Sequence, residues 1–156
     1  MALERLHFTQ SLPIPLDEAW AFFSDPRNLP VITPPALGFR ILSHPPAAIH
    51  AGLMISYSVR PLPGLRTLWV SEITHARAPG YFVDEQRVGP YRLWHHEHHF
   101  RAAPGGGTLV EDEIHYLLPF GFAGSWAAGW LVRRQLRAIF AFRKAALAQR
   151  FPPPSA

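Results

Sequence analysis

Residues 91–118 decide the fold of this chain, and they read YRLWHHEHHF (91–100), RAAPGGG (101–107) and TLVEDEIHYLL (108–118). Two alternating segments flank a glycine-rich turn, which is the pattern of a β-hairpin. Strand residues point alternately to opposite faces, so each segment divides into two sets. One set is solvated and rich in His, Glu and Arg. The other set is mainly apolar and comprises Trp94, His96, His98, Phe100, Val110, Asp112, Ile114 and Tyr116.

Three ionisable residues interrupt this apolar face. Burial of His96, His98 and Asp112 is costly unless they are paired, and a few polar groups within apolar walls are typical of a ligand cavity. A three-residue loop at 104–106 would place His98 opposite Asp112, where the two side chains can touch. The carboxylate would orient the imidazole and favour its charged form. The pair then holds the strand register, contacts a ligand or performs acid–base catalysis, and all three roles stay open.

Length and composition bound the class of protein. With 156 residues, 48% of them hydrophobic, the chain is predicted to form one domain over residues 1–150, followed by a disordered tail at 151–156. The absence of cysteine excludes disulfides and thiolate catalysis and fits the cytoplasmic location that we expect. The net charge of +4 is mild and forms no basic stripe with exposed aromatics, so we expect no nucleic-acid partner.

The remaining segments predict an α+β layout. Short helices are expected at 16–24 and 27–31 and a long amphipathic helix at 122–150. Strands are expected at 4–11, 38–43, 53–60, 65–76, 82–88, 91–102 and 108–118. A single antiparallel sheet must cover its apolar face, and only the C-terminal helix is long enough to do so. Leu131 and Leu136 of this helix are predicted to roof the cavity.

A second polar pair lies on the earlier strands. If residues 78–80 form a three-residue loop, Glu72 faces Gln86 across the sheet. We predict that both point into the cavity. The alternative is that both face solvent, because the opposite set (Trp69, Ser71, Ile73 and Val83) is at least as apolar.

Four segments carry a resemblance to a known superfamily: PLDEAWAFFSDPRNLP (15–30), WVSEIT (69–74), FVDEQRVGPYRLWHHEHHF (82–100) and GTLVEDEIHYLLPFG (107–121). The chain resembles the START-like, or SRPBCC, helix-grip superfamily, and within it the bacterial ligand-binding and polyketide cyclase/dehydrase-like members. The resemblance implies a curved antiparallel sheet of about seven strands that grips the last helix around an elongated hydrophobic cavity. It is specific for fold and weak for function, because one fold hosts binders, transporters and enzymes.

Three functions follow from this resemblance and from the polar face. The first is binding of a small hydrophobic ligand, such as a lipid, a polyketide-like aromatic or an isoprenoid. The second is a cyclase/dehydratase-like enzyme in which His98, oriented by Asp112, removes a proton beside a carbonyl whose oxygen Tyr116 polarises. The third is a quinone or lipid chaperone that contacts the membrane through the C-terminal helix, where Trp126 and Trp130 lie near an arginine-rich face.

The same residues offer an alternative use as metal ligands. His96 and His98 lie two residues apart on one strand face with Asp112 nearby, and such a set can bind zinc or non-haem iron. No third histidine is clearly placed on that face, because His95 and His99 point the other way. The sequence therefore predicts no metal and no cofactor.

Overall fold

A computed structural model describes residues 3–62, 64–119 and 126–153. The strands are β1 (Glu4–Leu12), β2 (Arg40–Ile41), β3 (Leu53–Leu62), β4 (Leu65–Arg77), β5 (Tyr81–Val88), β6 (Leu93–Ala102) and β7 (Thr108–Leu117). The helices are α1 (Leu16–Phe23), the 3₁₀ segments η1 (Pro26–Ile32) and η2 (Pro35–Leu37), and α3 (Trp126–Arg150). Residues 122–125, which we predicted to open the last helix, lie outside the described residues.

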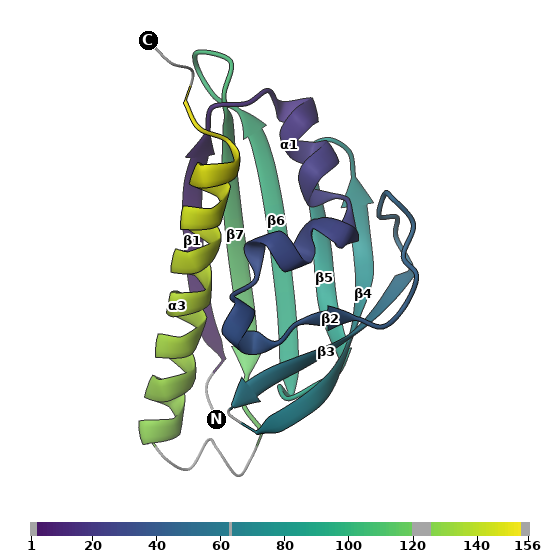
Figure 1. The fold of residues 1–156 in the computed structure, drawn as a ribbon, viewed down its shortest axis with the longest axis vertical. Helices are drawn as coiled ribbons and strands as arrows, with labels where there is room; N and C mark the ends of the chain where they lie inside the picture. The colour runs from purple at the N-terminus through teal and green to yellow at the C-terminus, as the bar shows by residue number, and fades with distance from the viewer. Residues whose placement is uncertain (1–2, 63, 120–125, 154–156) are drawn as a thin grey trace.

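The strands form one antiparallel sheet in the order β1-β7-β6-β5-β4-β3-β2. The sheet curves, and α3, α1 and the 3₁₀ segments all lie on its inner side (Figure 1). Helix α3 runs along the β1 side, where the rings of Phe8 and Phe140 stack with centroids 4.2 Å apart. The predicted α+β helix-grip fold is confirmed.

The β6–β7 hairpin has the predicted register. His98 lies opposite Asp112, His96 opposite Ile114 and Trp94 opposite Tyr116. The loop closes with a hydrogen bond of 2.8 Å from the Ala103 amide to the Gly107 carbonyl. Two residues of the loop, at positions 105 and 106, have φ of 85° and 87°, a region that only glycine enters readily. The turn therefore requires its glycines, and the register brings the ionisable residues to the inner face.

Strand β4 differs from the prediction because it contains a register shift between Ile73 and His75. Glu72 therefore lies opposite Glu85 rather than Gln86, and its carboxylate pairs with Arg87 at 2.6 Å on the outer face. The prediction that Glu72 faces the cavity is wrong. The inner face of this part of β4 carries Ser71 and Ile73, which are both buried.

Gln86 is held by the backbone of Tyr91. Its Nε2 donates to the Tyr91 carbonyl at 2.6 Å, and its Oε1 accepts from the Tyr91 amide at 3.2 Å. Gln86 is absent from the cavity lining, so the predicted ligand contact is corrected. Both hydrogen bonds brace the connection between β5 and β6.

Helix α3 buries a stripe of side chains spaced three or four residues apart. The stripe comprises Val132, Leu136, Ile139, Phe140, Arg143 and Leu147. Leu131 does not roof the cavity as predicted, since 49% of it is exposed. At 3.6 residues per turn it lies about 100° around the helix from Val132, outside the stripe.

The C-terminal boundary also differs from the prediction of a tail that starts at residue 151. Phe151 is 9% exposed, and its ring meets that of Phe22 edge-on with centroids 5.2 Å apart. Its amide donates to the Leu147 carbonyl at 2.9 Å, which continues the helix by one bond. The packed unit therefore extends at least to Phe151.

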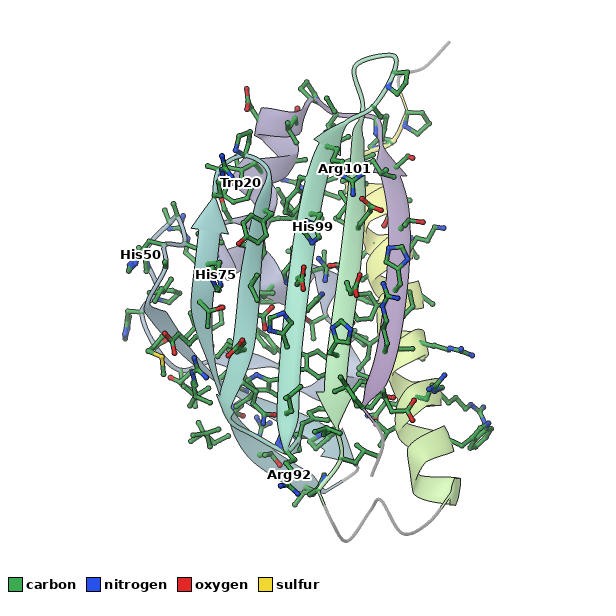
Figure 2. The ribbon with its side chains drawn as sticks, turned by 180° about the vertical axis from the view of Figure 1, so that it is seen from behind. Trp20, His50, His75, Arg92, His99 and Arg101 are labelled. Carbon is green, nitrogen blue, oxygen red and sulfur yellow. The ribbon has the colours of Figure 1, made fainter. Side chains whose placement is uncertain are left out.

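The outer face of the sheet is solvated and charged, as predicted, and Figure 2 shows it with His99 and Arg101 labelled. Its histidines pair with neighbouring carboxylates, for example His95 with Glu85 at 2.8 Å and His99 with Glu97 at 2.9 Å. Among the described residues, no helix is long and apolar enough to cross a membrane.

Candidate functional site

A cavity of about 240 Å³ lies between the inner face of the sheet, η1 and α3. Most of its wall is apolar. The apolar lining includes Phe23, Leu29, Ile32, Phe39, Ile49, Ile55, Val59, Ile73, Phe82, Leu136, Ile139 and Phe140. The rings of Tyr57, Trp69, Tyr91 and Trp94 add amphipathic surface.

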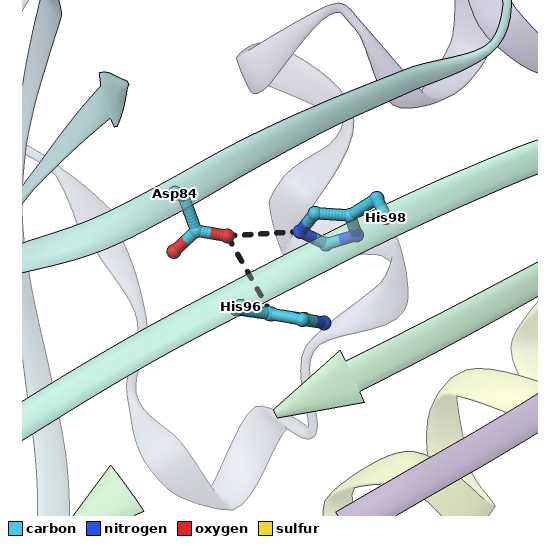
Figure 3. A group of neighbouring side chains, drawn as sticks. All are labelled: Asp84, His96 and His98. Atoms are coloured by element: carbon cyan, nitrogen blue, oxygen red, sulfur yellow. Dashed lines mark hydrogen bonds and ion pairs between the residues drawn. The ribbon is translucent and has the colours of Figure 1, made fainter. Parts of the chain in front are cut away.

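One wall of the cavity is ionisable and is built by neighbouring strands. Asp84 of β5 lies directly opposite His96 of β6, and Phe82 lies opposite His98. Asp84 Oδ2 is 2.8 Å from His98 Nε2 and 3.5 Å from His96 Nδ1 (Figure 3). The two imidazoles overlap with ring centroids 3.8 Å apart, and the Phe82 ring stacks on His98 at 4.1 Å.

Asp112 of β7 lies behind the histidines, away from Asp84. Its Oδ1 accepts a hydrogen bond from His96 Nε2 at 3.1 Å and lies 2.9 Å from His98 Nδ1, where the geometry is not that of a hydrogen bond. Arg143 of α3 forms an ion pair with this aspartate, because its Nη2 lies 3.3 Å from Asp112 Oδ1. We refer to these five residues as the buried ionic cluster: Asp84, His96, His98, Asp112 and Arg143.

Mutual charge sets the protonation states of the buried ionic cluster. Burial disfavours the charged form of His98, but the carboxylates of Asp112 and Asp84 outweigh it, so the pKa of His98 is raised. Burial and the neighbouring His98 lower the pKa of His96 to about 4. Burial would raise the pKa of Asp112, but Arg143 and the two histidines hold it well below its usual range, and the pKa of Asp84 is lowered too. The pKa values of the two neighbouring histidines are therefore shifted in opposite directions, while both carboxylates are favoured in their charged form.

The sequence matches a family profile over residues 12–142 of the chain, and the family is described as "Polyketide cyclase / dehydrase and lipid transport". The chain belongs to this family. The membership confirms the sequence resemblance to the SRPBCC superfamily. A comparison with curated proteins finds no significant match.

Solved structures share the fold of this polyketide cyclase/dehydrase family member at low identity. The Zhui aromatase/cyclase from Streptomyces sp. R1128 has a TM-score of 0.74 at 15% identity, with 96% of this chain and 93% of that chain covered. Protein CV1439 from Chromobacterium violaceum has a TM-score of 0.71 at 12% identity, covering 97% and 99%. A norcoclaurine synthase from Thalictrum has a TM-score of 0.66 at 13% identity, covering 96% and 97%. Such likeness shows the fold alone.

The structure separates the predicted site residues into three groups. Trp94, His96, His98 and Leu136 line the cavity. Four more are buried on the same face but do not border the cavity: Phe100, Asp112, Ile114 and Tyr116. Glu72, Gln86 and Leu131 lie elsewhere, as described above.

Sequence reasoning missed several polar residues of the cavity wall, among them Tyr57, Asp84 and Arg143. Arg143 could have been found, because it lies four residues from both Ile139 and Leu147 on the apolar stripe of the helix. Asp84 shares its strand parity with Phe82, but the shift in β4 hid which parity is inward. No feature of the sequence distinguishes Tyr57 from the other alternating residues of its strand.

Proposed function

We propose that this family member binds a small, mainly apolar molecule that carries a carbonyl or carboxylate oxygen. The observation that carries the proposal is Arg143, a buried arginine that lines the apolar cavity and whose Nε has no hydrogen-bond partner among the described residues. An unpaired buried donor costs about 1–3 kcal/mol, and a charged one costs more. A ligand oxygen would remove that cost and orient the molecule against the buried ionic cluster.

The cavity limits the size of this ligand. Its volume of about 240 Å³ lies near the lower end of small-molecule pockets, which measure about 300–1,000 Å³. That space suits a small ring system or a short acyl or prenyl segment. Burial of roughly 200 Å² of apolar ligand surface would contribute about 5 kcal/mol, before the cost of lost ligand freedom is subtracted.

Mass spectrometry of organic extracts from the purified protein identifies a co-purified ligand, and a fluorescent probe measures the site directly. The probe is 1,8-anilinonaphthalenesulfonate, an aromatic anion, titrated while its own emission and the quenching of tryptophan emission are followed. Ile139→Phe fills the cavity and should weaken probe binding at least tenfold. Leu131→Phe, on the exposed side of the same helix, should leave it unchanged. Equal affinity in the two variants would contradict a ligand site in this cavity.

A cyclase/dehydratase-like activity is the second candidate, favoured by the His98–Asp84 contact of 2.8 Å in the cavity wall. In that mechanism the ionic wall would stabilise negative charge that develops on a substrate oxygen. The His98→Gln variant distinguishes the two functions when it is assayed with a poly-β-ketone substrate. An enzyme would lose turnover while it retained binding, whereas a binding protein shows no turnover before the substitution.

A membrane-associated lipid or quinone chaperone is the third candidate. Trp130 is 60% exposed, Arg134 lies 5.3 Å from the centre of its ring, and Leu131 is also exposed. An aromatic residue next to a basic side chain suits an anionic membrane surface. Flotation with liposomes tests this function: binding that requires anionic lipid and weakens in Trp130→Ser supports it, and absence of flotation rejects it.

A further inference from the structure

Three donor atoms converge at the cavity wall. Asp84, His96 and His98 each offer one ligand atom, and the three atoms lie within 4.8 Å of one another (Figure 3). The distances from Asp84 to the two histidine nitrogens are 2.8 and 3.5 Å. A metal ion bound at about 2.0–2.2 Å by each donor requires donor separations of about 3.0–3.5 Å. The His96 nitrogen already lies at such a distance from the carboxylate, and the His98 nitrogen would have to move away from it by a few tenths of an ångström.

The nitrogen on the other side of each ring lies beside Asp112, and the one on His96 is hydrogen-bonded to it. Asp112 Oδ1 binds His96 Nε2 at 3.1 Å and lies 2.9 Å from His98 Nδ1. Each imidazole therefore has one nitrogen toward Asp84 and the other toward Asp112. A carboxylate on the far nitrogen is the usual support of a metal-binding histidine, because it fixes the ring and increases its basicity.

The charges of the buried ionic cluster and its position beside the cavity also favour a metal site. Asp84 and Asp112 bring two negative charges to the cluster, and Arg143 supplies one formal positive charge among the fully ionised side chains. A metal ion bound beside Asp84 would offset the remaining negative charge. Asp84, His96 and His98 border the cavity whereas Asp112 does not, so open coordination positions would face the ligand space.

We propose that Asp84, His96 and His98 bind one divalent first-row transition metal ion of the zinc or iron(II) class, with open positions toward the cavity. Two imidazoles and one carboxylate form a donor set suited to these ions rather than to Ca²⁺ or Mg²⁺, which prefer oxygen. The site goes beyond the proposed function and stands without it. The sequence missed the site because its third ligand is Asp84 rather than a third histidine or Asp112.

Cobalt(II) titration of protein purified without a histidine tag and freed of metal by EDTA tests the site. The visible ligand-field bands of bound Co²⁺ should saturate at one ion per chain. Asp84→Asn should weaken binding at least 100-fold, and Asp112→Asn should weaken it 10- to 100-fold. His99→Gln removes a histidine from the outer face and should leave affinity unchanged. Absence of saturable bands, or equal affinity in wild type and Asp84→Asn, would overturn the proposal.

X-ray absorption covers the case in which the Asp84 and Asp112 variants fail to fold by circular dichroism. The sample is the zinc-loaded double variant His95→Gln/His99→Gln, which keeps the inner residues and removes two outer imidazoles. Two imidazole nitrogens and at least one oxygen at about 2.0–2.1 Å are expected around zinc. A shell with fewer than two imidazoles would reject the site. Binding of the naphthalene probe in EDTA is the separate measure of the proposed ligand function.

Discussion

Replacing Arg143 by methionine tests whether its guanidinium keeps Asp112 charged inside the fold. Nη2 lies 3.3 Å from Asp112 Oδ1, and both side chains are buried. At an effective dielectric constant of 20, this separation corresponds to an attraction of about 5 kcal/mol. Asp112 keeps its contacts with His96 and His98, which reduces the loss. We therefore expect Arg143→Met to lower the free energy of unfolding by about 3–4 kcal/mol, within the range for broken buried ion pairs.

The double-mutant cycle with Asp112→Asn isolates this interaction. In the Asp112→Asn background, Arg143→Met should cost about 1 kcal/mol, which gives a coupling energy of about 2–3 kcal/mol. Urea unfolding, followed by tryptophan fluorescence in EDTA, measures all four proteins, with sucrose added if a variant is marginal. Arg137→Met, on the exposed side of α3, is the control and should change stability by less than about 0.5 kcal/mol. A coupling energy below about 0.5 kcal/mol would refute the electrostatic role of Arg143.

Three further outcomes follow from the structure. In EDTA, the free energy of unfolding should fall by up to about 3 kcal/mol as the pH is lowered from 6.5 to 4. Over this range His96 is protonated in the unfolded chain but stays neutral in the folded protein, where its pKa is about 4. The free energy of unfolding should also fall as the pH rises above 6.5, because folded His98, whose pKa is raised, then loses its proton. Urea unfolding at a series of pH values measures both effects. An unchanged loss of stability at acid pH in His96→Gln would contradict the role of His96. Phe151→Ala should cost about 3 kcal/mol by urea unfolding, because its ring is buried against Phe22. Gly106→Ala places a side chain at φ of 87° and should cost at least about 1 kcal/mol in the same assay, and a neutral result would mean that the loop adopts another turn.

The hairpin was predictable because two local signals agree. Its turn residues set the loop length, and alternation then assigns every side chain from Trp94 to Tyr116 to a face. A shift of one residue would expose all the aromatic residues to water, so burial and turn chemistry select the same register. Every inward residue predicted in β6 and β7 is indeed buried.

The part of the site on β4 and β5 was not predictable, because it depends on a register shift in β4 that no sequence pattern indicates. The register shift in β4 inserts one extra residue between Ile73 and His75. The alternation of inner and outer residues is therefore reversed from one side of the shift to the other. Alternation counted from the turn at residues 78–80 therefore gives the wrong face for Glu72, although it is correct for Ala76 and Phe82, which pair directly. Counting inward from the β6 side would have placed Asp84 opposite His96, but that count needs the irregular connection through residues 89–92, whose shape depends on the contacts of Gln86.

The geometry of His98 restricts any chemistry at this site. One ring nitrogen lies 2.8 Å from Asp84 and the other lies 2.9 Å from Asp112, so a carboxylate stands beside each nitrogen. The predicted removal of a substrate proton by His98 would first require one carboxylate to move away. A proton on His98 or a metal ion beside it would instead oppose negative charge on a ligand oxygen, together with Arg143. Such a wall stabilises an enolate-like oxygen but does not itself generate one. A catalytic function would therefore need its base elsewhere on the cavity wall, and Tyr57 is a poor candidate because burial and the charge of Asp84 raise its pKa.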